Sequence, residues 1–193
     1  MPWEKSFDED EVVGKAMKVF WEKGFEPASM ADLIAGTGIT RGSLYNAFGG
    51  KEPLFVRALQ KYEKDNRRAL LAELEALDDP TRAIAELFDG IVAETVADTE
   101  KKGCFLVNTA SDLATHGDEV NGLVRNGMRE IQAFFRRSIE VGQARKQIPE
   151  TLDPDATAKG LVAMVVAIRV LGRGVFDEAS LQTIAAQAQR LLR

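Results

Sequence analysis

The chain has 193 residues, of which 45% are hydrophobic and 28% charged, and this is enough apolar material for one good core or for a small and a larger domain. The composition excludes an intrinsically disordered chain. A single cysteine (Cys104) and a single histidine (His116) exclude a disulfide framework, a Cys/His zinc site and a multi-histidine metal centre. We therefore predict no metal, no cofactor and no catalytic residues.

The chain also lacks the signals of export or membrane insertion. Trp3, Glu4 and Lys5, followed by the acidic run 8–11, form neither the basic start nor the apolar stretch of a secretory signal. The longest apolar stretch, 160–168, falls well short of the roughly 20 residues that cross a bilayer. We expect a cytoplasmic protein with no membrane contact.

Apolar residues recur at spacings of three and four along almost the whole chain, and no alternating β-branched run appears. This pattern predicts an all-α protein of about nine helices. Cap residues place the helices at about 8–23, 29–36, 41–48, 51 to beyond 64, 80–99, 104–115, 118–144, 154–171 and from 178 onward. We expect a three-helix head over residues 1–59 and a larger helical bundle over residues 60–193.

Charge is distributed unevenly along the predicted head. Residues 1–35 hold four lysines and eight acidic residues, whereas residues 36–68 hold seven basic and three acidic residues. The sequence therefore predicts a positive field that begins at the helix expected over 41–48. For Arg67 and Arg68, late in this run, we expect a solvated helix face and no part in a binding surface.

The segment from Ser29 to Phe55 has the form of a helix-turn-helix. Two short helices are joined by a glycine-containing turn, and Thr40 is placed to cap the second. Leu44 and Phe48, four residues apart, are expected to face the core of the head. The polar and small residues of this helix then face outward, where a recognition helix reads a major groove.

Four motifs resemble those of the tetracycline-repressor-like (TetR) family. They are Phe-x-x-x-Gly-Phe at Phe20–Phe25, Ala-Ser-Met-Ala-Asp-Leu-Ile at Ala28–Ile34, Gly-Ile-Thr-Arg-Gly-Ser-Leu-Tyr at Gly38–Tyr45, and Phe-x-x-Lys-Glu-x-Leu at Phe48–Leu54. The resemblance covers roughly the first 60 residues. It implies a DNA-binding transcriptional regulator.

The resemblance also implies residue roles. Thr40, Tyr45 and Lys51 would bind phosphates, and Lys51 lies beside a helix N-terminus that itself attracts anions. The groove would receive Arg41, Gly42, Ser43 and Asn46, and Ser29 completes the predicted DNA-binding set. The chain departs from the family at Asn46, Ala47 and Gly50, where many members have His and Ser or Asp, so the operator sequence does not follow from the resemblance.

The larger domain is expected to hold a ligand pocket and a dimer face. The predicted pocket residues are Phe88, Phe105, Asn108, Asp112, Met128, Phe135 and Met164, of which Asn108 and Asp112 would orient a ligand. The predicted dimer face, from helices 154–171 and 178 onward, is Leu161, Val165, Ile168, Leu181, Ile184 and Ala188. Arg169 is expected in an interface salt bridge or at an anionic ligand, and His116 at the surface.

Together these features predict a homodimeric repressor that binds a pseudo-palindromic duplex operator and is released by a small-molecule effector. The sequence leaves alternatives open. One is a thiol-based redox sensor acting through Cys104, since a helix N-terminus stabilises a thiolate. Another is a DNA-binding adaptor without a ligand, and a third is a small helical enzyme.

Overall fold

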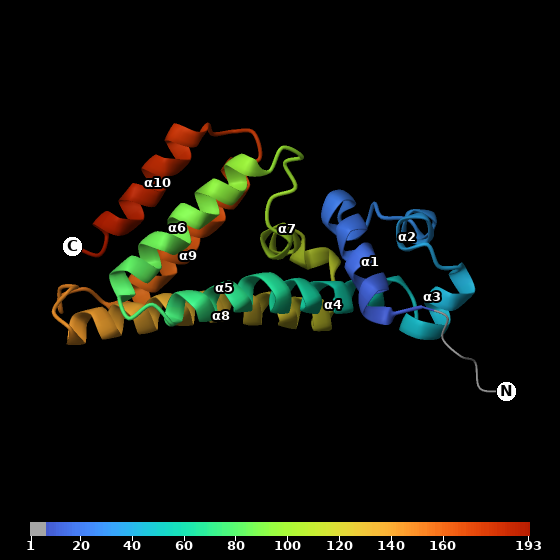
Figure 1. Ribbon diagram of the computed structural model, residues 1–193, viewed down its shortest axis with the longest axis horizontal. Helices are drawn as coiled ribbons and strands as arrows, with labels where there is room; N and C mark the ends of the chain where they lie inside the picture. Colours follow the sequence, from blue (N-terminus) through green and yellow to red (C-terminus); the bar gives the residue numbers. More distant parts are fainter. Residues whose placement is uncertain (1–6) are drawn as a thin grey trace.

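The computed structural model describes residues 7–193, which form helices and connecting loops without a strand (Figure 1). Trp3, Glu4 and Lys5, which bear on the question of a secretory signal, lie outside the described residues. Within residues 7–193 no helix is both long and apolar enough to cross a bilayer. The all-α prediction is confirmed.

The head consists of α1 (Glu9–Lys23), α2 (Met30–Thr37), α3 (Arg41–Phe48) and the first turns of α4 (Lys51–Tyr62). Its helix starts follow from local chemistry. The Asp8 carboxylate accepts from two amides at the start of α1, and Ser29 and Asp32 form a reciprocal capping box on α2. Phe20, Leu33, Leu44 and Phe55 are almost fully buried and make the core between these helices.

A long rod connects the head to the larger domain (Figure 1). It comprises α4, a π-helical segment (Glu63–Arg68) and α5 (Ala69–Glu75), which follow one another without a break. The helix predicted from Lys51 to beyond Lys64 is therefore present. The π-helical segment was not predicted; such segments are rare and often occur at functional sites.

The larger domain contains α6 (Pro80–Ala97), α7 (Phe105–Ser111), a 3₁₀ turn (Leu113–Thr115), α8 (Asp118–Ala144), α9 (Pro154–Leu171) and α10 (Glu178–Arg190). α8 lies beside the rod, and α6 packs with α8, α9 and α10 (Figure 1). Asp79 and Asp153 cap α6 and α9, each with proline in the first turn. With the rod counted once, residues 7–193 hold nine α-helices, as predicted. The helix expected over 104–115 is shorter, because α7 ends at Ser111 and Asp112 leaves helical geometry.

Five of the six residues predicted for the dimer face are already buried within the single chain. Leu161, Val165, Ile168, Leu181 and Ala188 are buried within the single chain, and Ile184 is partly buried. The apolar stripes of α9 and α10 pack against each other and against α6 of the same chain. Helical periodicity identifies which face of a helix is buried, but it does not say whether the covering element belongs to the same chain.

Candidate nucleic-acid interface and ligand cavity

α3 is fixed at both ends and along its inner face. The Thr40 hydroxyl oxygen accepts from the Ser43 amide at 3.1 Å, and the Thr40 hydroxyl donates to the Ser43 hydroxyl oxygen at 3.0 Å. Gly49 ends the helix with a left-handed φ of 82°, a conformation that favours glycine. Leu44 and Phe48, on the inner face of the helix, are buried in the core of the head. The predicted recognition helix is therefore mounted rigidly on the head.

The outer face of α3 carries the residues predicted to contact DNA. Arg41, Gly42, Tyr45 and Asn46 are exposed, and Ser43 is half-buried. The Arg41 guanidinium lies 5.7 Å from the centre of the Tyr45 ring, so two side chains predicted to contact DNA lie side by side. A Cβ added to Gly42 would meet only the Thr40 hydroxyl, at 3.9 Å, so the backbone here is open to a close approach.

Lys51 stands at the start of α4, next to the end of α3. Its ammonium donates to the Glu26 carbonyl at 3.2 Å and lies 4.6 Å from the centre of the Phe25 ring. Gly50 provides no side-chain cap, which leaves the first amides of α4 free of a side-chain partner. The Tyr45 ring packs against Gly50. Lys51, the open amides and Tyr45 thus form one anion-attracting surface.

Ser29 is exposed, but its polar groups already serve the capping box. Its hydroxyl donates to the Asp32 carboxylate at 2.6 Å and accepts from the Asp32 amide at 3.1 Å. The Lys23 ammonium, followed by hydrogen bonds from the Ser29 hydroxyl and the Ser29 amide to the carboxylate, holds the pKa of Asp32 far below its usual range. A DNA contact by Ser29 would therefore have to use the hydroxyl that already caps the start of α2.

The positive field predicted over residues 36–68 is largely cancelled in the folded chain. Arg57 pairs with Glu9, Lys61 with Asp10 and Asp65, Arg67 with Glu63 and Glu130, and Arg68 with Glu130. Within residues 7–193, only Arg41, Lys51 and Lys64 of this basic run form no ion pair. The solvated face expected for Arg67 is wrong, because its side chain is 9% exposed. The unpaired cations of this run are thus Arg41 on α3, Lys51 at the start of α4, and Lys64 in the π-helical segment of the rod.

A cavity of about 590 Å³ lies between the rod and the larger domain. Its apolar wall comes from several helices and includes Leu71, Leu87, Ile91, Leu106, Ile131 and Val165. Polar and charged side chains also line it, and they are Tyr62, Asp65, Asn66, Arg67, Glu73, Glu94, Thr95, Asp98, Glu100, Lys102, Cys104 and Arg169. The volume is in the range of small-molecule sites.

The predicted pocket residues are divided among three places. Met128 lines the large cavity. Phe105, Asn108 and Asp112 line a smaller cavity of about 320 Å³ between the head and the larger domain. Phe88 and Phe135 lie in the packed core, with ring centres 5.8 Å apart, and Met164 packs partly buried against it. Because aromatic side chains fill cores as readily as they line pockets, sequence alone does not separate the two roles.

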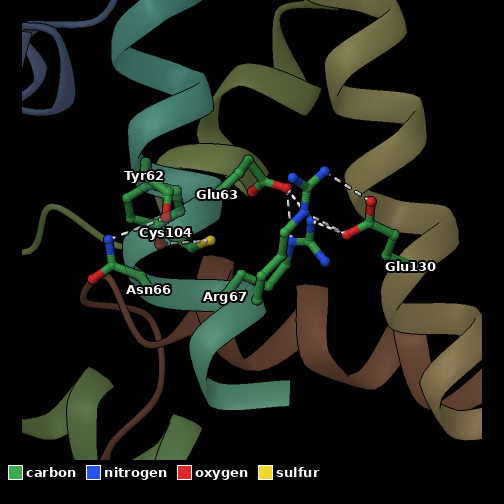
Figure 2. A network of polar contacts seen from close by, with 7 residues as sticks. Tyr62, Glu63, Asn66, Arg67, Cys104 and Glu130 are labelled. Atoms are coloured by element: carbon green, nitrogen blue, oxygen red, sulfur yellow. Dashed lines mark hydrogen bonds and ion pairs between the residues drawn. The ribbon is translucent and has the colours of Figure 1, made fainter. Parts of the chain in front are cut away.

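Residues that the sequence did not single out for the cavity form its polar end. The Tyr62 hydroxyl donates to the Cys104 sulfur at 3.3 Å (Figure 2). Burial, then the neighbouring Cys104, raises the pKa of Tyr62 well above its usual value. Arg169, expected in an interface salt bridge or at an anionic ligand, lines the cavity, where it pairs with Glu94 at 2.5 Å and donates to the Thr95 hydroxyl at 3.4 Å. No sequence signal identifies Tyr62, which lies on a helix expected to be continuous.

His116 is not the surface residue that its Thr-His-Gly turn suggests. Its ring stacks on Phe55 with centres 5.2 Å apart and lies 5.1 Å from Phe25. Burial lowers its pKa. His116 precedes α8 and is packed against two residues of the head, so it joins the head to the larger domain.

Two family models match the chain in regions that correspond to the head and the larger domain. One, for bacterial regulatory proteins of the tetR family, matches residues 13–58, and the other, a tetracyclin repressor-like C-terminal domain, matches residues 80–188. The HTH-type transcriptional repressor ComR of Escherichia coli is 31% identical over 97% of this chain and 90% of its own length. An HTH-type regulator of Bacillus subtilis, YezE, is 29% identical over 92% of both chains.

The fold is also similar to solved structures. A cysteine mutant of the TetR-family regulator CifR, complexed with double-strand operator DNA, superposes with a TM-score of 0.84 at 28% identity, covering 97% of this chain and 98% of that one. The similarity therefore extends over the head and the larger domain together. With the helix-turn-helix, the capped recognition helix and the matching C-terminal domain, this chain belongs to the TetR family of DNA-binding transcriptional regulators.

Proposed function

We propose that this protein is a homodimeric repressor whose two α3 helices bind the half-sites of a pseudo-palindromic operator. The observation that carries the proposal is the outer face of α3, where Arg41, Tyr45 and Asn46 are exposed on a helix fixed by Thr40. Arg41 and Asn46 would donate to base edges, while Thr40, Tyr45 and Lys51 would bind phosphates. The relatives named as repressors and the operator complex of CifR support it.

A small molecule in the 590 Å³ cavity is proposed to release the operator. The rod lines this cavity and continues without a break to Lys51, so a ligand that shifts the rod would also shift the head. A cavity of this size argues against the ligand-free adaptor. Effector binding and operator binding would then be linked reciprocally.

The dimer is proposed to form through the outward faces of α9 and α10. Val170 on α9 is 43% exposed in the single chain, and Val175 and Phe176, in the turn that joins α9 to α10, are 71% and 40% exposed. Large apolar side chains of this kind gain from burial at an interface. We expect light scattering to give a dimer mass and Phe176→Asp to shift the population toward monomer. A monomer in the unmodified protein at micromolar concentration would contradict this arrangement.

The main test is recovery of genomic fragments bound by the purified protein, followed by anisotropy titrations of the recovered duplexes. We expect one sequence with two inverted half-sites about 10 base pairs apart, centre to centre. The chemistry of the neighbouring genes would then direct the search for the effector. Binding that shows no preference between recovered and scrambled duplexes at moderate salt would refute the proposal.

A second candidate function is regulation through Cys104. The hydrogen bond from Tyr62 to its sulfur at the cavity favours this thiol as a reactive group. The chain has one cysteine, so an intrachain disulfide is excluded. Peroxide would oxidise the thiol to a sulfenic acid with release of water, and a second thiol molecule would be needed only to form a disulfide from it. We expect peroxide to release the operator from the unmodified protein and not from Cys104→Ser. An equal peroxide response in both would dismiss the thiol mechanism.

A further inference from the structure

We propose that the loop over residues 98–104 couples the 590 Å³ cavity to the head, and that Trp21 of α1 is the positioning residue of this coupling. The inference rests on the proposed function, because it takes the cavity as the site that controls operator binding. It deepens that function by adding a second connection to the head, separate from the rod, and by naming the residue through which this connection acts.

Trp21 is a residue of the head that reaches both the loop and the cavity. Its indole Nε1 donates to the Gly103 carbonyl at 3.0 Å. Its ring meets the Tyr62 ring edge-on with centres 5.0 Å apart, and it lies 6.3 Å from the Phe105 ring in a stacked orientation. Trp21 is partly buried and lines the cavity together with Tyr62 and Gly103. Part of the cavity wall therefore belongs to the head itself.

The loop that leads from α6 to α7 is held in shape by its own contacts (Figure 1). The Asp98 carboxylate accepts from the Gly103 amide at 2.8 Å and closes the loop across its base. Arg173, in the turn after α9, donates from Nε to the Lys101 carbonyl at 2.9 Å. Gly103 has a left-handed φ of 68°, and a Cβ added to it would lie 2.8 Å from the Arg173 side chain. A movement at one part of such a loop is passed on to its other contacts.

The same loop forms one wall of the cavity and is also paired with α1. Asp98, Glu100 and Lys102 line the cavity. The Lys102 ammonium pairs with Glu100 and, at 3.3 Å, with Glu22, the residue that follows Trp21 on α1. Because α1 packs on α2 and α4, a ligand that displaces the loop would also move the end of α1 and the helices of the head packed on it.

Trp21 is the stronger of these two links between the loop and α1. The side chain of Glu22 is 50% exposed, and ion pairs at such positions contribute little because solvent screens them. The hydrogen bond from Trp21 is partly buried, and the contacts with Tyr62 and Phe105 fix the plane of the indole ring. The position of the Gly103 carbonyl is therefore transmitted to α1 mainly through Trp21.

Linkage is reciprocal, so the operator itself serves as the probe: binding at α3 must change the loop if the loop controls the head. Amide hydrogen exchange of the full-length protein is measured alone, with a recovered operator duplex and with a scrambled duplex. We expect the operator, and not the scrambled duplex, to slow exchange over residues 98–104 about fivefold, the factor that corresponds to one hydrogen bond. An exchange rate of the loop that stays constant while the operator binds overturns the inference.

The indole ring gives an independent measurement. The chain has two tryptophans, so Trp3→Phe leaves Trp21 as the single tryptophan. We expect the emission of Trp21 to change when the operator duplex is added and to stay constant with the scrambled duplex. Constant emission at saturating operator would show that Trp21 keeps its surroundings, and this result also overturns the inference.

Matched variants assign the coupling to one hydrogen bond. Trp21→Phe keeps an aromatic ring but removes the Nε1 donor, so it should still bind the operator through α3 and lose the response of the loop. Gln132→Met removes a bond of similar length, 2.8 Å to Asp155, between α8 and α9, and it should keep the response.

The outcomes separate this inference from the proposed function. A loop response that persists in Trp21→Phe overturns the inference. Faster exchange throughout the head of Trp21→Phe, together with weaker operator binding, would show a purely structural role and would overturn it as well. No preference for any recovered duplex in the unmodified protein contradicts the proposed function, whereas operator binding without a response of the loop contradicts the inference alone.

Discussion

Replacing Lys51 with alanine should weaken operator binding in a way that depends strongly on salt. The ammonium is positioned on the Phe25 ring and the Glu26 carbonyl beside the open N-terminus of α4, so it is held ready for a phosphate. In the proposed dimer the change removes two phosphate contacts. Each contact contributes about 0.9 to the slope of log K against log salt, so the slope should become shallower by about 1.8.

This change has a measurable size. Between 50 and 200 mM salt, a slope difference of about 1.8 corresponds to about a 12-fold change in relative affinity. The penalty of Lys51→Ala should therefore be about 12-fold larger at the lower salt concentration. Anisotropy titrations of a recovered operator duplex at four or five salt concentrations would measure it.

Lys64→Ala is the matched control, because it removes the same charge from an exposed residue of the rod that forms no ion pair within residues 7–193. We expect its slope to stay close to that of the unmodified protein. Equal slopes for all three proteins would show that Lys51 does not contact phosphate, and equal losses in both variants would mean that only net charge matters.

Three further changes have outcomes that follow from the structure. Gly42→Ala should fold normally, since the added Cβ meets only an oxygen at 3.9 Å, yet it should lose operator affinity if DNA approaches this backbone; unchanged affinity would refute that approach. His116 is the single histidine, and burial lowers its pKa in the folded state. The unfolded chain therefore binds more protons below about pH 6.5, and stability should fall as the pH drops through this range, by at most about 1.4 kcal/mol per pH unit. Urea unfolding of His116→Gln should lack this component, and an identical pH profile would contradict it. Gly127→Ala would place a methyl group 2.7 Å from the Glu63 carboxylate and should cost about 1–3 kcal/mol in urea unfolding. Gly122→Ala on the same helix meets nothing within 4 Å and should be neutral or stabilising; equal effects of the two would refute the packing argument.

The sequence predicted the helices closely because their ends are set by neighbouring residues. Asp8, Thr40, Asp79 and Asp153 each accept from amides two or three positions later in the chain. The recognition helix was predicted from Arg41 to Phe48, the bounds that it has in the structure. The outward position of Arg41, Tyr45 and Asn46 follows from helical periodicity once Leu44 and Phe48 face inward.

Charge was less predictable than helix position. The basic run suggested a positive field along the rod, but Arg57 pairs with Glu9, 48 positions away, and Arg67 with Glu130, 63 positions away. Partners so distant in the chain meet only when α1 and α8 pack against the rod. For the same reason, His116 appeared to be a surface residue until Phe25 and Phe55 were seen to cover its ring.

By itself, the sequence determined the helix-turn-helix, its cap at Thr40 and the set of residues facing outward, because these depend on interactions within one or two helical turns. Only the tertiary structure decided which basic residues remain free, that Leu161 and Ile168 lie inside the chain, and that Tyr62, Arg67 and Cys104 meet at one cavity. These properties depend on which helices pack together. The apolar stripe of a helix shows that another element covers it, but the stripe does not identify that element.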